Sequence, residues 1–387
     1  MPIVNRVADL HPEIVAWRQD IHAHPELRYE ERRTAAMVTE KLTSFGCDDV
    51  VCGLGRTGVV GIIRGRRAGR AIALRADMDA LPIEEETALP YRSTVPGKMH
   101  ACGHDGHTAM LLGAAKYLAE TRNFAGTAVV VFQPAEEGGA GARAMLEDGL
   151  LTRFAIEEVY GMHNYPGLPL GQFAIRPGPM MASADHITID LEGKGGHAAR
   201  PHLSIDTILV GAQIVTALQS IVARNVDPLQ AAVVSICMFQ GGHTDNVIPQ
   251  HAQLRGTARA LVEEVREILR RRVPEVVEGT ARLYGAKAKI TYTNGYPVLV
   301  NHPRQTEFAA SVAREIAGED KVDTDCAPLM GAEDFAFMLG ERPGAFIFMG
   351  NGESAGLHHP AYNFNDEAIP AGTSYWVRLA ERALAVE

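Results

Sequence analysis

Three histidines, one cysteine and one aspartate lie within residues 99–107, in the sequence MHACGHDGH. Thiolate, imidazole and carboxylate groups together suit zinc or a neighbouring first-row metal rather than calcium or magnesium. The flanking glycines and histidines make Cys102 and His104 candidate metal ligands. His100 and His107 could instead be surface or helix-capping residues, an interpretation that we favour for His100, and Asp105 could cap the helix that follows.

Acids and histidines also follow apolar runs elsewhere in the chain. Glu136 and Glu137 end the run VVVFQPAEE, and His163 ends VYGMH. His358 and His359 lie in GLHHPAYNFND, where either could be an ordinary turn residue. Because the carboxyl ends of parallel strands meet at one edge of a sheet, these side chains can converge. The paired glutamates allow one to bind metal while its neighbour acts as a general base.

The elements that must position these residues alternate between helix and strand. Apolar residues recur at helical spacing in two N-terminal segments and again after the histidine-rich stretch. One continuous apolar run lies before the third helical segment and another follows it; both end in acids, which is typical of buried parallel strands. The helical segments are 11–27, 30–45 and 108–120, and the strand segments are 70–83 and 126–142. This order predicts an α/β domain with a mostly parallel sheet covered on both faces.

A second pattern interrupts the first in the middle of the chain. Residues 185–197 alternate strictly between apolar and polar, as a strand with one wet face does. A long helix, further strands and a charged helix follow. We therefore predict a catalytic metal-binding domain of residues 1–182 and 294–387, with an α+β domain of residues 183–293 inserted into it.

Composition limits the partners and the compartment. The chain has 387 residues and a formal net charge of −10, without a basic stripe, so we expect neither nucleic acid nor a membrane as a partner. The N-terminal residues lack a signal-peptide pattern, and no run of eighteen apolar residues occurs. Five scattered cysteines do not form a disulfide framework. These features favour a cytoplasmic protein.

Motifs along essentially the whole chain resemble the aminoacylase and carboxypeptidase-type co-catalytic metallopeptidases. The closer resemblance is to their amidohydrolase branch, which includes hippurate hydrolases and plant indole-acetyl-amino-acid hydrolases. The motifs include HAHPEL, ALRADMDALPI, FQPAEEGGAGA, GKGGHAARPH, MGAEDFAF and LHHPAYNFND. The resemblance implies a zinc-peptidase-like fold, Glu136 as the catalytic base, and two divalent ions per subunit (Zn, Mn, Co or Ni). The implied ligands are Cys102, His104, Glu137, His163 and His358.

The inserted domain carries further residues that the resemblance singles out. It implies that His197 reaches a neighbouring subunit's site and stabilises the oxyanion. Asn246 and Arg259 resemble residues that hold the substrate carboxylate, for which the planar guanidinium fork is well suited. Glu333, in the motif GAEDF of the catalytic-domain segment 294–387, is expected to have a supporting role. The inserted domain is accordingly expected to act as a lid and a dimerisation surface.

Two positions depart from the pattern of the broader family. Asp77 occupies a place where that family has a histidine, and Cys102 replaces a metal-bridging aspartate. Both departures are typical of the amidohydrolase branch. Because a thiolate bridge can be oxidised, they leave the identity and the affinity of the two metals open.

We expect a homodimeric or larger metal-dependent amidohydrolase that cleaves N-acyl amino acids to a carboxylic acid and an amino acid. A dipeptidase or carboxypeptidase that uses the same binuclear site is one alternative. A metal-containing binding protein without turnover is another. The retained Glu136 beside Glu137 argues against the second, because an inactive site does not need a general base.

Overall fold

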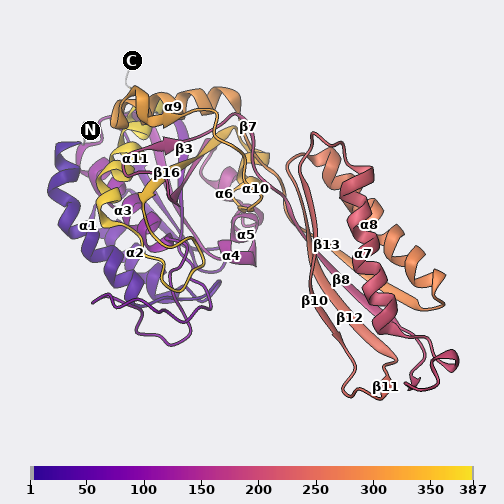
Figure 1. The fold of residues 1–387 in the computed structure, drawn as a ribbon. Coiled ribbons are helices and arrows are strands. Elements are labelled where there is room, and N and C mark those ends of the chain that lie inside the picture. The colour runs from indigo at the N-terminus through magenta and orange to yellow at the C-terminus, as the bar shows by residue number, and fades with distance from the viewer. Residues whose placement is uncertain (1–3, 386–387) are drawn as a thin grey trace. The chain divides into compact units, whose positions relative to one another are not determined.

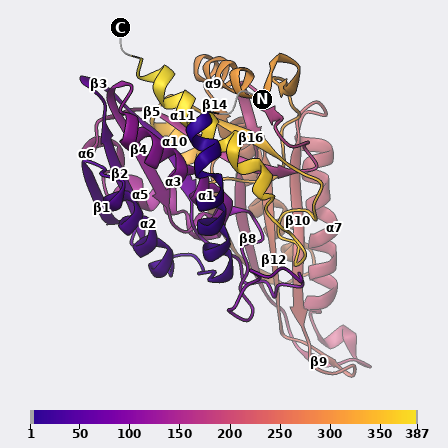
Figure 2. The ribbon, with the colours of Figure 1, turned by 90° about the vertical axis from the view of Figure 1, so that its left-hand side faces the viewer.

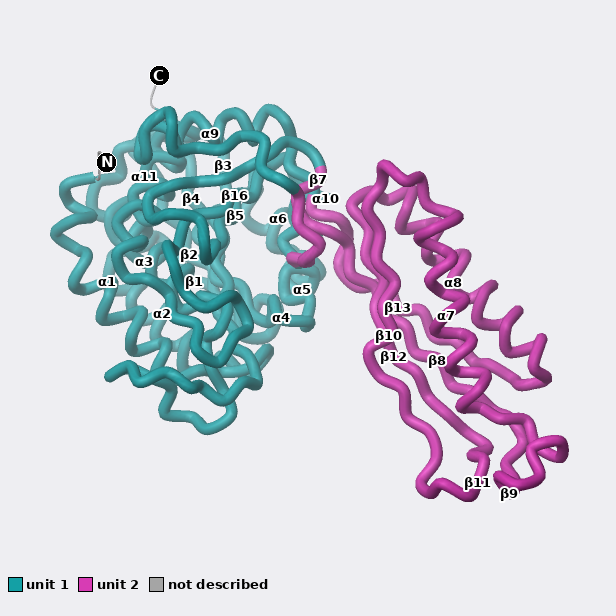
Figure 3. The backbone as a smooth tube through the Cα atoms, viewed as in Figure 1, with its two compact units in different colours: residues 1–178, 300–327, 334–387 teal, residues 179–299, 328–333 magenta. Residues whose placement is uncertain are grey.

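The computed structural model describes residues 4–385, and the chain divides into two compact units. Unit 1 comprises residues 1–178, 300–327 and 334–387, and unit 2 comprises residues 179–299 and 328–333 (Figure 3). Unit 2 thus begins four residues before the boundary expected from the sequence and ends six residues after it. It also takes in a short segment, 328–333, that the sequence pattern did not assign to it.

Unit 1 is built on one eight-stranded sheet with the order β1-β2-β4-β3-β5-β16-β6-β15. Its four central strands run parallel to one another, while β1, β2 and the β16–β6 pairing are antiparallel. The predicted α/β class with a mostly parallel sheet is confirmed. The strands are β1 (Asp49–Leu54), β2 (Gly58–Arg64), β3 (Arg67–Asp77), β4 (Ala125–Gln133), β5 (Ile156–Pro166), β6 (Phe173–Ala174), β15 (Val322–Asp323) and β16 (Gly344–Gly352).

Helices cover both faces of this sheet. Helices α1, α3 and α11 pack on one another on one face, and α5, α6 and α10 lie on the other (Figures 1 and 2). Helix α3 is buried almost all round, which its run of alanine, leucine and methionine permits. The helices are α1 (Asn5–Ala23), α2 (Arg32–Ser44), α3 (His104–Thr121), α4 (Glu136–Gly139), α5 (Gly141–Glu147), α6 (Leu150–Arg153), α9 (Pro303–Ala317), α10 (Ala336–Glu341) and α11 (Ile369–Ala383).

Unit 2 has a four-stranded antiparallel sheet with the order β10-β12-β8-β13, packed against two helices. In its centre Ile189 of β8 faces Leu254 on one side and Ile290 on the other. The alternating pattern of residues 185–192 is therefore that of a half-buried strand. The elements are β8 (Ala184–Glu192), β9 (Gly196–His197), α7 (Thr207–Asn225), β10 (Ala232–Gly241), β11 (Val247–Ile248), β12 (His251–Ala260), α8 (Glu263–Leu283) and β13 (Lys287–Tyr296). Where the chain passes from one unit to the other, β7 (Gly178–Met181) and β14 (Leu299–Asn301) form a separate two-stranded pair.

Helix α7 is the one helix within residues 4–385 that could cross a membrane, judged by length and composition alone. Its residues Val210, Ile214, Leu218 and Ile221 are buried in the core of unit 2. A core helix needs such an apolar face, so its composition follows from its place against the sheet.

Candidate metal centre

The candidate site lies in unit 1, where the carboxyl ends of three parallel strands meet. Asp77 ends β3, Glu136 and Glu137 follow β4, and His163 lies near the end of β5. Cys102 immediately precedes helix α3, whose first residue is His104. The topology thus brings together side chains that are up to 86 positions apart in sequence, between Asp77 and His163.

The start of α3 depends on a glycine rather than on a side-chain cap. Gly103 is the N-cap residue with a φ of 89°, and a Cβ there would lie 2.3 Å from Asn164 Oδ1. Asp105 does not cap the helix, so that prediction is wrong. Its carboxylate is fully buried and lies 2.8 Å from His22 Nδ1 and 3.5 Å from the Arg18 guanidinium. These charged partners on α1 hold the residue inside the protein.

The two remaining histidines of the opening stretch are also buried. His100 is only 1% exposed and neither ring nitrogen has a hydrogen-bond partner within residues 4–385, so its assignment to the surface is wrong. Burial lowers the pKa of His100 to about 3, and the imidazole is therefore neutral. His107 Nδ1 lies 2.6 Å from Asp77 Oδ1, and His107 Nε2 lies 2.7 Å from Asn164 Oδ1.

The five residues predicted as metal ligands form two groups that share Cys102. Cys102, His104 and His163 make one group, and Cys102, Glu137 and His358 make the other. Within each group the potential ligand atoms lie within 4.8 Å of one another. Cys102 Sγ is 3.5 Å from His163 Nε2. Glu137 Oε1 is 3.0 Å from His358 Nε2, an ion-pair distance without hydrogen-bond geometry.

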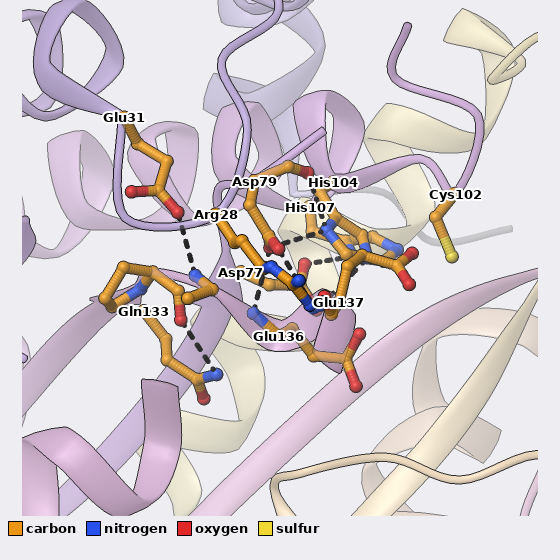
Figure 4. Close-up of polar contacts among 12 residues, drawn as sticks. Arg28, Glu31, Asp77, Asp79, Cys102, His104, His107, Gln133, Glu136 and Glu137 are labelled. Atoms are coloured by element: carbon orange, nitrogen blue, oxygen red, sulfur yellow. Dashed lines mark hydrogen bonds and ion pairs between the residues drawn. The ribbon is translucent and has the colours of Figure 1, made fainter. Parts of the chain in front are cut away.

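Hydrogen bonds to the far side of each ring orient the buried histidines. His104 Nδ1 lies 2.9 Å from the Asp79 carbonyl oxygen and 3.2 Å from its carboxylate (Figure 4). His163 Nδ1 lies 2.7 Å from the carbonyl oxygen of Asn164. A ring that donates through Nδ1 presents Nε2 as a ligand, which is how metal-binding histidines are held in proteins. His104 Nε2 has no hydrogen-bond partner among the described residues.

Asp79 also fixes the turn that carries the two glutamates. Its carboxylate accepts hydrogen bonds from the backbone N–H groups of Glu136, at 3.1 Å, and Glu137, at 2.9 Å. Arg28 donates to the Glu137 carbonyl oxygen at 3.0 Å, and in Figure 4 its guanidinium lies against this turn. Ala135 has a φ of 52°, a left-handed conformation that sharply ends β4. The turn is therefore fixed from two sides.

The side chain of Glu136 is buried beside the ligand groups. Its Oε1 accepts a hydrogen bond of 3.3 Å from the backbone N–H of Asp334, and one potential ligand group joins it to His104 and Glu137. Beneath it, the buried Arg75 guanidinium binds Asp77 at 2.7 Å and Asp334 at 3.1 Å. An uncompensated buried guanidinium would be costly, so these carboxylates are its necessary partners.

His358 joins the cluster through its backbone. Its N–H donates to the Ala101 carbonyl oxygen at 2.7 Å, and its φ of 63° is left-handed. This conformation is uncommon for a residue with a side chain, and is found where the surrounding structure requires it. The neighbouring His359 instead accepts a hydrogen bond from the backbone N–H of Ala361.

The charges of the cluster fit a metal-binding role. Burial, with nearby Glu137, raises the pKa of the Cys102 thiol well above its usual value. Burial lowers the pKa of His104, but Asp77 and Asp79 outweigh it and raise the pKa to about 10. Both groups thus carry protons that a cation would displace, since the ligand forms are thiolate and neutral imidazole. A soft thiolate, imidazoles and a carboxylate within 4.8 Å suit zinc or a neighbouring first-row metal.

His197, Asn246 and Arg259, which were expected in the inserted domain, lie in unit 2, and so does Glu333, which was expected in the catalytic domain. His197 is exposed on β9, and the segment before β11 brings Asn246 close, with the Ala198 N–H donating to the Asn246 carbonyl oxygen at 3.0 Å. Arg259 lies on a different sheet, in β12 opposite Val233. Glu333 is buried at the end of segment 328–333.

Several residues that support the site escaped the sequence analysis. They include Arg28, Arg75 and Asn164, each of which has a partner far away in the chain. Asn164 had a signal, because it directly follows His163 in the motif HNYPG. The distant partners, Glu137 of Arg28 and Asp334 of Arg75, could not have been identified from spacing.

The fold and the cysteine, histidine and glutamate cluster are those of a metallopeptidase-like hydrolase. Residues 73–382 match peptidase family M20/M25/M40. The chain belongs to this family and is an amide-bond hydrolase, which confirms the resemblance seen in the motifs.

Relatives cover nearly the whole chain. Hippurate hydrolase of Campylobacter jejuni is 42% identical over 384 residues, 99% of this chain and all of that protein. N-acetylcysteine deacetylase of Bacillus subtilis is 42% identical over 373 residues, 96% of each chain. The crystal structure of the Bacillus subtilis YXEP protein, a dinuclear metal binding peptidase from the M20 family, is similar with a TM-score of 0.84. It is 37% identical and covers 97% of this chain and 99% of that one.

Proposed function

We propose that this protein hydrolyses N-acyl amino acids to a carboxylic acid and an amino acid, using two divalent metal ions. The observation that carries the proposal is the pair of ligand groups sharing Cys102, with Glu136 buried beside them. The names of the hippurate hydrolase and N-acetylcysteine deacetylase relatives support the N-acyl amino acid as the substrate class. Zinc, manganese, cobalt and nickel all suit this donor set.

The proposed ligands would fall into two sets that share Cys102. Cys102 would contribute to both positions, because it belongs to both groups. When bound, the ions supply Lewis-acid polarisation of the amide carbonyl and lower the pKa of water. The remaining ligands would be His104 and His163 at one position and Glu137 and His358 at the other.

Glu136 is the proposed general base. Its carboxylate would take a proton from the attacking water and then deliver it to the nitrogen of the leaving amine. The Asp334 N–H, 3.3 Å from Oε1, holds the carboxylate in place. Because Asp334 is itself bound by buried Arg75, this donor is fixed before substrate arrives.

The residues of unit 2 are proposed to act on the substrate rather than on the metal. Arg259 and Asn246 would bind the carboxylate of the amino acid, and His197 would donate a hydrogen bond to the developing oxyanion. The exposed position of His197 on β9 supports a role toward a second subunit, and we propose a homodimer or larger homo-oligomer. The scattered cysteines, none of which is in a disulfide within residues 4–385, support a cytoplasmic location.

A peptidase activity on the same site is the second candidate. Thermostable carboxypeptidase 1 of Saccharolobus solfataricus is 40% identical over 365 residues, 93% of this chain. A panel of benzoylglycine, acetyl-amino acids and dipeptides, assayed with metal-loaded protein, separates the two. We expect a higher kcat/KM on the N-acyl amino acids. A preference for the dipeptides would favour the peptidase.

A further inference from the structure

The turn after β4 is held by two buried carboxylates from elsewhere in unit 1. Three consecutive backbone N–H groups of the turn, those of Ala135, Glu136 and Glu137, donate to them. Asp79 accepts the last two, and Glu31 accepts the first at 2.8 Å. Within residues 4–385, Glu31 belongs to none of the potential metal-ligand groups. It therefore supports the turn at the residue directly before Glu136, without taking part in the metal cluster.

The side chain of Glu31 is turned away from the helix that it begins. Glu31 is the N-cap residue of α2, but its carboxylate makes no capping hydrogen bond. A side-chain oxygen at this position ordinarily accepts from the first turn of the helix. Glu26 accepts instead from the N–H groups of Arg33 and Thr34. Because Glu26 satisfies these donors, the fully buried carboxylate of Glu31 can bind other segments.

One oxygen of Glu31 binds two residues that have an uncommon conformation. Oε1 accepts from the N–H of Tyr29 at 2.9 Å and from that of Ala135 at 2.8 Å. Tyr29 has a φ of 64° and Ala135 a φ of 52°, and both are left-handed. Residues with a side chain keep this conformation where the surrounding structure requires it. The other oxygen, Oε2, accepts from the Thr57 hydroxyl at 2.6 Å, which fixes the carboxylate.

The segment that contains Glu31 also binds the carbonyl groups of the turn. Arg28 donates to the Glu137 carbonyl oxygen at 3.0 Å, and the Tyr29 hydroxyl donates to that of Gly139 at 2.7 Å. Figure 4 shows Glu31 and Arg28 beside the turn. Arg28 thus acts on the ligand Glu137, whereas Glu31 acts on the residue before the base.

We propose that Glu31 is a positioning residue for the general base Glu136. The inference rests on the proposed function, in which Glu136 transfers the proton. Rotation of the backbone at Ala135 changes the direction of the next side chain, so the left-handed conformation determines where the Glu136 carboxylate lies. Without Glu31, the Ala135 N–H would lose its buried acceptor, and the residue would favour a commoner conformation.

Loss of the Glu31 carboxylate should therefore affect turnover rather than metal binding. Glu137 would still be held by Asp79 and Arg28, so elemental analysis should find the metal content of the wild type. Glu31→Ala should lower kcat about tenfold to a hundredfold, because a displacement of about 1 Å costs about a hundredfold. KM for benzoylglycine should change less than about twofold, since substrate binding does not depend on the base.

Glu31→Gln is the conservative comparison. Its amide oxygen can accept from the N–H groups of Tyr29 and Ala135, and its amide nitrogen can donate to the Thr57 hydroxyl oxygen. We expect a kcat within about threefold of the wild type, because the hydrogen bonds are kept. A kcat as low as that of Glu31→Ala would contradict positioning through these hydrogen bonds.

Glu158→Ala is the matched control for the loss of a buried carboxylate. Glu158 also has three partners, which are Tyr160, Gln305 and Arg70. It lies near the start of β5, whereas the ligand groups lie at the carboxyl ends of the strands. Urea unfolding measures the loss of stability in both alanine variants, and we expect Glu158→Ala to keep its kcat. An equal loss of kcat in both would show general destabilisation and overturn the proposal.

The action of Glu31 through Glu136 has its own test. In a Glu136→Gln background, Glu31→Ala should lower the residual kcat less than about threefold, because residues that act as a unit have non-additive effects. The same fold-loss in both backgrounds would show that Glu31 does not act through the base.

Failure of this inference can be separated from failure of the proposed function. If the metal-loaded wild type hydrolyses N-acyl amino acids but Glu31→Ala keeps its kcat or loses its metal, the inference alone is wrong. If the wild type cleaves only dipeptides, the proposed function is wrong, and the same comparison of kcat on a dipeptide still tests Glu31. If the wild type cleaves neither, both are wrong.

Discussion

Glu136 and Glu137 are neighbours in sequence, but different partners surround their carboxylates. Glu137 lies 3.0 Å from His358 and shares a potential ligand group with Cys102. Burial raises the pKa of Glu137, but the contact with His358 and the charge of His104 lower it by more. The carboxylate is therefore ionised and available as an anionic ligand. Glu136 instead accepts a hydrogen bond from the backbone of Asp334. These surroundings support the proposed division between ligand and base.

Conservative substitutions of the two glutamates should therefore have different effects. Glu136→Gln should keep its metal but lose turnover by about a hundredfold to ten-thousandfold, the usual range for a general base. Glu137→Gln should lower the metal content, because an amide is a weaker ligand than a carboxylate. Elemental analysis and kcat measured on the same samples test this. Equal metal contents in both variants would contradict the division.

The residue types alone were sufficient to nominate the cluster, but not to predict its surroundings. Cys102, His104 and His163 could be chosen because their side chains favour a soft metal. The burial of His100 and the contact between Asp105 and His22 could not be predicted, because both depend on how α1 packs against α3. Local spacing carries no information about a partner 83 positions away.

At the scale of elements, helices α1 and α3 are joined by a buried cluster of charges. Arg18 of α1 binds Asp366 through a bidentate contact at 2.7 and 2.8 Å and lies near Asp105 of α3. His22 lies between Asp105, at 2.8 Å, and Glu85, at 3.4 Å. Since α3 carries His104 in its first turn, this cluster anchors the element that presents a candidate ligand.

The charge of His22 makes this anchor dependent on pH. Despite the cost of burial and the nearby Arg18, hydrogen bonds to Asp105 and Glu85 raise the pKa of His22 from 6.5 to about 9. Because protonated His22 is favoured in the folded state, it contributes fully to the free energy of unfolding below pH 6.5. This contribution is lost as the pH rises toward 9. Over that interval the loss is about 1.4 kcal/mol per pH unit at most.

His22→Gln should remove this dependence. In urea unfolding of metal-free protein, the difference in unfolding free energy between wild type and variant should shrink steadily from pH 6.5 to pH 9. His24→Gln, at a histidine just after the same helix whose side chain is 40% exposed, serves as the matched control for the substitution itself. A difference for His22→Gln that does not change with pH would show that His22 is not charged in the folded protein.

Long apolar patterns predicted the elements better than short turns. The runs that became β3, β4 and α3 were identified because their buried parts are continuous and apolar, as in the last seven residues of β3. The left-handed turn at Ala135 and the four-residue helix α4 were not predicted, because alanine carries no preference for a positive φ. That turn is stabilised by Asp79 and Glu31, which are distant in sequence.

At the scale of the whole molecule, the chain leaves unit 1 and returns to it twice. Unit 2 contributes one long segment, 179–299, and the short segment 328–333. The change from helical to strictly alternating spacing was the basis for expecting a boundary at residue 183, four residues after the long segment begins. The short segment has no strand or helix pattern that sequence reading could use, so its membership follows only from three-dimensional contacts.

If His197 serves the site of a second subunit, activity belongs to the oligomer. His197→Ala should lower kcat by about a hundredfold to a thousandfold without loss of metal, as the loss of an oxyanion donor does. Mixing this variant with Glu136→Gln should restore activity, up to about half of the wild-type value per mixed dimer, because one site then has both residues. Differently tagged chains establish that subunits exchange. Exchange without recovered activity would show that His197 does not act across subunits.

The central claim is that a metal centre held by Cys102, His104, Glu137, His163 and His358 drives the hydrolysis of N-acyl amino acids. The most direct measurement follows the release of glycine and benzoate from benzoylglycine by chelated protein while zinc, manganese, cobalt or nickel is added back in known equivalents. We predict no release from protein shown by elemental analysis to be metal-free, and equimolar products that rise as metal is restored up to two equivalents. Full activity in the metal-free protein would contradict the claim.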